Sequence, residues 1–184
     1  LVGSEMCIRD RGTDGWFTFG PQGRPGADKP NMDTVPAMAL FSAKKPLKRN
    51  VTWQYEGPVL ADFGHQLSRT YECPDLFQLD GKTVAIGALM HYRDKQGRFQ
   101  QVRWYVGDLK DTAEGPRLQV GNSDWCDFGT GYYATQSFAA DDGRRIVFGW
   151  YTDFPAMRVE KPCIANGMMS LPRELHVRDG RLTS

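Results

Sequence analysis

LFQLDGKTVAIGALM, residues 76–90, is the stretch that decides the fold. Asp80-Gly81 separates two apolar runs, and a type I′ turn between two strands needs positive φ at both central positions, which favours Asp-Gly. The stretch therefore predicts a β-hairpin. Two further turns of this kind are expected, at Asp141-Asp142-Gly143 and at Asp179-Gly180.

The rest of the chain repeats this pattern of short apolar runs between turn residues. No window of about 11 residues has the apolar spacing of a helix. Strands are expected at residues 16–19, 37–42, 52–56, 101–106, 132–138, 145–150 and 175–177. Regularly spaced strands without helices indicate an all-β sandwich, barrel or propeller. Trp53, Trp104 and Trp150 lie 51 and 46 residues apart, close to the length of one propeller blade, and this favours the propeller.

Composition excludes several classes of partner. The chain has 184 residues with 40% hydrophobic content, enough for one domain with a core, and its net charge of +1 gives no support to nucleic-acid binding. No apolar run is long enough to cross a membrane, and no signal peptide is recognisable. Nothing in the sequence indicates an oligomeric state.

The four cysteines form no CxxC pair and no cluster with histidine, so neither a metal nor another cofactor is expected. Their even number permits two disulfides, but their scatter is more typical of free buried thiols. The compartment therefore stays open between a secreted, a periplasmic and a cytoplasmic one. The histidines have no triad or metal spacing, and His65 is expected to be solvent-exposed.

Residues 1–11, LVGSEMCIRDR, show neither strand alternation nor a helix cap. They resemble a non-biological run that recurs at the ends of assembled sequencing reads, so we leave them out of the fold prediction. Residues 181–184 begin a new strand pattern. We expect a non-native segment at 1–11 and a β-domain at 12–184 that is truncated at both ends.

Glu72 is the candidate catalytic acid. It precedes Cys73 and Pro74, and a proline restricts the residue before it, so Cys73 is expected to be extended with Glu72 at the entry of a strand. Apolar neighbours favour the neutral form of a carboxyl group, which a general acid requires. The alternative is an ordinary surface glutamate before a strand.

Five motifs stand in one order along the chain: Glu72-Cys73-Pro74, Tyr105-Val106-Gly107-Asp108, Asp127-Phe128-Gly129, Gln136-Ser137-Phe138, and Ser170-Leu171-Pro172-Arg173-Glu174-Leu175. In this order they resemble glycoside hydrolase family 32, the β-fructosidases that include invertases, inulinases and levanases. The resemblance is loose from about residue 15 and close from Tyr71 onward. It implies a five-bladed β-propeller with a central funnel, of which this chain would be a part.

The resemblance also implies an activity. It is the hydrolysis of β-fructofuranosidic bonds in sucrose, inulin or levan by a retaining mechanism, with Glu72 as acid/base. The family's nucleophile is an aspartate in an Asn-Asp-Pro-Asn motif that this sequence lacks, so the chain alone is expected to be inactive. A third family carboxylate lies in Arg-Asp-Pro; Asp10 is the candidate for it, inside the segment that we leave out.

Four further residues are predicted to bind substrate, each with an alternative. Cys73 contacts substrate or packs in the core, and Asp75 orients Glu72 or caps its own backbone. Tyr133 and Trp150 line the sugar pocket or belong to the core. Two alternatives for the whole chain stay open, a carbohydrate-binding β-propeller without catalytic activity and a fructosyltransferase of the same family.

Overall fold

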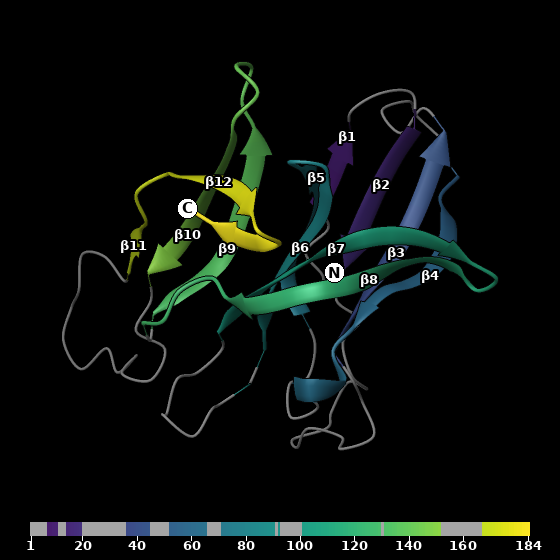
Figure 1. The fold of residues 1–184 in the computed structure, drawn as a ribbon, viewed down its shortest axis with the longest axis horizontal. Coiled ribbons are helices and arrows are strands. Elements are labelled where there is room, and N and C mark those ends of the chain that lie inside the picture. Colours follow the sequence, from purple (N-terminus) through teal and green to yellow (C-terminus); the bar gives the residue numbers. More distant parts are fainter. Residues whose placement is uncertain are drawn as a thin grey trace.

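The computed structural model describes residues 7–10, 14–19, 36–44, 52–65, 71–90, 92, 101–129, 131–151 and 167–184, and the side chains from residue 36 onward except that of Lys44. Within these residues the secondary structure is β-strand apart from one turn of 3-10 helix, η1 (Phe63–His65). No helix in the described part has the length and apolar character needed to cross a membrane. The expected all-β class is confirmed (Figure 1).

The strands form three antiparallel sheets. The first holds β1 (Cys7–Asp10), β2 (Asp14–Phe19), β3 (Ala37–Lys44) and β4 (Gln54–Ala61). The second holds β5 (Tyr71–Leu79), β6 (Lys82–Leu89), β7 (Val102–Thr112) and β8 (Gly115–Trp125). The third holds β9 (Tyr132–Ala139), β10 (Arg145–Tyr151), β11 (Met168–Met169), β12 (Arg173–Arg178) and β13 (Arg181–Thr183).

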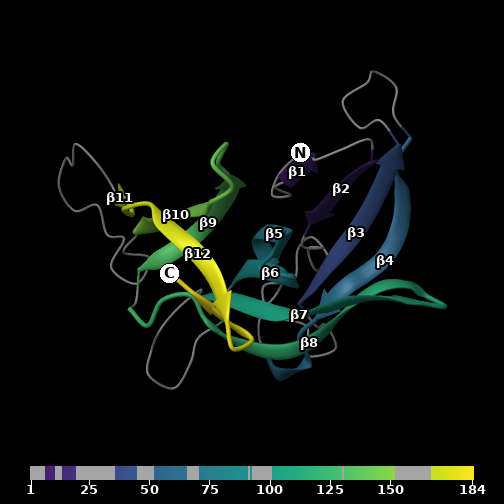
Figure 2. The same cartoon turned by 45° about the horizontal axis from the view of Figure 1, so that its top comes forward.

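The third sheet follows the same plan as the other two. One edge of β10 pairs with β9, while β12 and β11 pair with successive halves of its other edge. Each sheet is therefore a meander four strands wide, as a propeller blade is. The second sheet lies between the other two, and the described strands do not close into a ring (Figure 2). The chain is part of a β-propeller.

The second sheet is packed on both faces. Val84, Ile86 and Ala88 of β6 belong to a core cluster shared with the third sheet. Ala85 and Leu89 belong to a second cluster shared with the first sheet. Because both faces are buried, β6 is apolar almost throughout rather than alternating.

The three predicted turns are present. The turn at Asp141-Asp142-Gly143 joins β9 to β10 and has positive φ at Gly143, 89°, but at neither aspartate. Asp80 and Gly81 have φ of 48° and 76°, and Asp179 and Gly180 have φ of 50° and 71°. Both pairs therefore adopt the left-handed backbone that the Asp-Gly pattern predicts.

Three strands and one repeat were not predicted from sequence. One of the strands is the two-residue β11. β8 is polar because it is the last strand of its sheet, and Leu118 is its buried apolar residue. β1 pairs with β2 although its sequence has no strand pattern; the non-native origin of residues 1–11 stays a prediction. Trp53 precedes β4, Trp104 lies in β7 and Trp150 in β10, so the tryptophan spacing does not mark equivalent blade positions.

Candidate active site

A β-bulge lies directly after Glu72. Glu72 pairs with Ala88, but the next pair along the ladder is Asp75 with Ile86, so Cys73 and Pro74 together oppose Gly87. Cys73 has φ of 49°, and its expected extended conformation is therefore wrong. Some β-bulges contain a residue in this left-handed region, and Pro74 contributes no N–H whose ladder bond would be lost.

The bulge decides which way Glu72 points. In a regular strand, residues three apart lie on opposite faces. Here the extra residue brings Glu72 and Asp75 to the same face of the sheet. Their cross-strand partners are Ala88 and Ile86, which belong to the cluster shared with the third sheet. Tyr71 lies on the other face, in the cluster shared with the first sheet.

Tyr133 of β9 meets Glu72 across the gap between the two sheets. Its hydroxyl donates a hydrogen bond to Oε2 of Glu72. Tyr133 also precedes a residue with positive φ, Ala134 at 50°, at a second bulge where β9 pairs with β10. Both partners of this hydrogen bond are thus aimed by a bulge, a device that recurs next to active sites.

Behind Glu72 lies a buried ion pair. Asp75, 1% exposed, accepts a hydrogen bond of 2.5 Å from the Ser137 hydroxyl and one of 3.3 Å from Nη2 of Arg145. Nε of Arg145 donates to the same hydroxyl at 2.8 Å, and its guanidinium lies 3.9 Å from the Phe77 ring centroid. This network ties β5 to β9 and β10. Sequence reasoning did not assign Ser137 or Arg145 a role, because only the register of three strands brings them to Asp75.

The other predicted substrate-binding residues lie close by. Cys73 is buried, with 4% of its surface exposed. Trp150 pairs directly with Tyr133 across the sheet and packs partly buried against the core. The burial of Cys73 and Asp75 favours support of the site over contact with a sugar. The substrate-binding assignment of all four residues, Tyr133 included, stays a prediction.

Two other sequence expectations have different outcomes. His65 was expected to be exposed, which is wrong: its side chain is 14% exposed, with Nδ1 2.7 Å from Oδ2 of Asp62 and its ring 5.3 Å from that of Trp125. Asp10 ends β1, a strand that contacts β5, but its side chain lies outside the described ones, so its role stays a prediction. Among the described residues no three His, Cys, Asp or Glu side chains gather as metal ligands.

Comparisons with known proteins agree with this geometry. The family model described as the glycosyl hydrolases family 32 N-terminal domain matches residues 34–184. A sucrose-6-phosphate hydrolase of Vibrio alginolyticus is 31% identical over 155 residues, which are 79% of this chain and 30% of that protein. A raffinose invertase of Escherichia coli is 41% identical over 138 residues, 71% of this chain and 27% of that protein.

A solved structure shows the same fold. The glycoside hydrolase family 32 protein of Bifidobacterium adolescentis superposes with a TM-score of 0.83 at 67% sequence identity, over 92% of this chain and 32% of that one. The chain thus spans about a third or less of the proteins that it matches.

Proposed function

The chain belongs to glycosyl hydrolase family 32, and from this we propose that it supplies the acid/base half of an active site that hydrolyses β-fructofuranosidic bonds. Glu72 is the acid/base of a retaining, double-displacement reaction. The observation that carries the proposal is the hydrogen bond from Tyr133 to Glu72, each of which lies next to a bulge in its own strand.

In the first step Glu72 is the acid. A carboxylate nucleophile attacks C2 of the fructosyl unit while Glu72 protonates the oxygen of the departing sugar, and the bond between C2 and that oxygen breaks. Tyr133 donates to Oε2, which favours the proton of Glu72 on Oε1, ready for transfer. Tyr133 therefore holds the acid in one orientation.

In the second step Glu72 is the base. Its carboxylate takes a proton from a water molecule whose oxygen attacks C2, and the bond between C2 and the nucleophile breaks. Fructose leaves, the nucleophile is again a carboxylate, and Glu72 is again protonated. Attack by a sugar hydroxyl in place of water would make the same site a fructosyltransferase.

The nucleophile must be a second carboxylate about 5 Å from Glu72. The Asn-Asp-Pro-Asn motif implied for it does not occur in these 184 residues, and the chain covers about a third or less of its relatives. We place the nucleophile in a part of the full-length protein outside this chain. Sucrose-type fructosides are the proposed substrates, because the names of the relatives point to this class.

Glu72→Gln in the full-length protein tests the proposal. We expect kcat/KM for sucrose to fall by about 1,000-fold, because general acid catalysis contributes roughly that factor. A nitrophenyl β-fructofuranoside, whose leaving group needs no proton, should lose far less in kcat/KM. Equal losses on both substrates would remove Glu72 from the acid role. A wild-type protein that binds fructosides without cleaving them would instead indicate the carbohydrate-binding alternative.

A further inference from the structure

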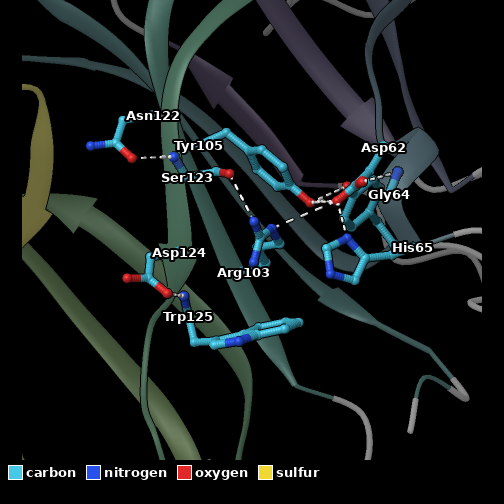
Figure 3. Close-up of polar contacts among 10 residues, drawn as sticks. Asp62, Gly64, His65, Arg103, Tyr105, Asn122, Ser123, Asp124 and Trp125 are labelled. Atoms are coloured by element: carbon cyan, nitrogen blue, oxygen red, sulfur yellow. Dashed lines mark hydrogen bonds and ion pairs between the residues drawn. The ribbon is translucent and has the colours of Figure 1, made fainter. Parts of the chain in front are cut away.

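The face of β5 opposite Glu72 carries a second polar network, and this one has no part in the mechanism above. Tyr71, the residue before Glu72, shares a hydrogen bond between hydroxyls with Tyr105 of β7. Tyr105 in turn donates to Oδ2 of Asp62, at 2.5 Å, just beyond the end of β4 (Figure 3). We call Tyr71, Tyr105 and Asp62 the tyrosine tether. It joins the start of β5 to β7 and to the first sheet.

The Tyr105 hydroxyl donates to Asp62. The Tyr71 hydroxyl shares a hydrogen bond with Tyr105 and also interacts with the Asp62 carboxylate. Burial raises the pKa of both Tyr71 and Tyr105, and the nearby Asp62 charge raises both further. Both hydroxyls therefore keep their protons throughout the working pH range.

Asp62 is a firmly held anchor for the tether. Its carboxylate accepts from the backbone N–H of Gly64 at 2.9 Å and lies 2.7 Å from Nδ1 of His65. Nε of Arg103 is 3.7 Å away, and the Arg103 guanidinium is held by Ser123 and lies over the Trp125 ring (Figure 3). Burial acts to raise the pKa of Asp62, but the hydrogen bonds from His65 and Tyr105 lower it to about 2.

The Tyr71 ring sits in a fitted socket. Gly87 lies under it, opposite the bulge, and a Cβ atom at Gly87 would come within 2.7 Å of both Tyr71 Cδ1 and Met38 Cε. The Tyr105 ring meets it edge-on with centroids 6.0 Å apart. Tyr71 is 1% exposed, so close packing restricts the position of its ring.

We propose that the tyrosine tether positions Glu72, acting on the acid through the backbone of β5. The inference rests on the proposed function, in which Glu72 must present its proton at a defined place. Tyr71, Tyr105 and Asp62 are positioning residues, since none of them touches the reacting atoms.

The backbone gives the reason. Tyr71 is the first residue of β5, and the bulge interrupts the pairing of β5 with β6 directly after Glu72. Regular pairing next to Glu72 is therefore limited to one residue, Tyr71. Successive side chains point to opposite faces of a strand, and the peptide unit between them is planar. A twist of β5 that swings Glu72 away from Tyr133 must therefore also swing Tyr71, which the tether resists.

Tyr105→Phe in the full-length protein removes the hydroxyl through which β7 holds both Tyr71 and Asp62, and changes little else in shape. We expect kcat/KM for sucrose to fall about tenfold, because a misplacement of 1 Å can cost about 100-fold and the shift expected here is smaller. The nitrophenyl β-fructofuranoside, which does not need the acid, should keep its kcat/KM within about twofold. Damage to the fold would lower both values alike.

Two further variants complete the test. Tyr55→Phe makes the same chemical change at an exposed tyrosine of β4 and should leave both substrates unaffected. Asp62→Asn keeps an oxygen acceptor without the charge, and should show a smaller loss of kcat/KM that is again selective for sucrose. It also serves as the test if Tyr105→Phe does not fold. Equal losses on both substrates, or none, in the tether variant that folds overturn the inference.

Glu72→Gln, measured beside them, separates the two proposals. If it shows the selective loss and the tether variants do not, only the positioning role is overturned. If Glu72→Gln itself shows no selectivity between the substrates, the proposed function is overturned and the positioning role with it.

Discussion

On each face of β5 a carboxylate ties the second sheet to a neighbour: Asp75 lies in β5 itself, and Asp62 lies just beyond the end of β4. The two carboxylates are compensated differently. Asp75, on the Glu72 face, is 1% exposed and faces the guanidinium of Arg145 at 3.3 Å. Asp62, on the Tyr71 face, is held by a hydroxyl, an imidazole and a backbone N–H, with Nε of Arg103 at 3.7 Å. One face depends on a buried pair of charges, the other on hydrogen bonds. The stability lost when each carboxylate is replaced should therefore differ in size and in pH dependence.

Asp75→Ala should have the largest effect. It leaves the buried Arg145 charge without its partner, and the loss of one member of a buried pair costs about 3–5 kcal/mol of unfolding free energy. Urea unfolding of the full-length protein measures it. Asp75→Leu combined with Arg145→Met removes both charges and should lose less than Asp75→Ala alone. A double variant that is as unstable as the single one or worse would show that the charges themselves are not what matters on this face.

Asp62→Asn should have a smaller effect that depends on pH. The folded pKa of Asp62, about 2, is below its ordinary value of 3.8, so its charge stabilises the fold above about pH 4. This contribution is lost as the pH falls through 2. The Tm of wild type should therefore exceed that of Asp62→Asn near pH 6, and the difference should shrink as the pH falls from 4 toward 2. A difference that is constant over this range would contradict the assignment.

Asp108→Asn should have the smallest effect. Asp108 forms a 3.0 Å ion pair with Lys82, but both side chains are more than 40% exposed. Exposed pairs of this kind contribute little because water and salt screen them. We expect no measurable change in Tm at physiological ionic strength. The variant thus serves as the surface reference for the effects of replacing Asp75 and Asp62. A clear loss of stability would mean that surface charge contributes more here than its exposure suggests.

The sequence predicts the features that depend on near neighbours. Asp80-Gly81 and Asp179-Gly180 set their own backbone conformation, so both turns could be predicted. The apolar run of β6 predicts a buried strand for the same reason. β8 could not be predicted, because a last strand of a sheet needs few apolar residues.

The candidate site depends on features that no local pattern contains. Glu72 and Tyr133 were identified as site residues, but their direct contact comes from two bulges. A bulge is a mismatch between two strands and has no meaning in one strand alone. The exposure of His65 was misjudged for a similar reason, since the ring of Trp125, at the end of β8, packs against it from a distant part of the chain.

The burial of the second sheet on both faces also affects when this sheet can complete its folding during translation. Translation completes the four strands of this sheet at Trp125, but Val84, Ile86 and Trp104 are covered by Tyr132, Val147 and Leu175. Synthesis proceeds at about 5–20 residues per second. For a few seconds the nascent chain therefore exposes the apolar face of a paired sheet. A chaperone that protects this face would have to bind during that interval.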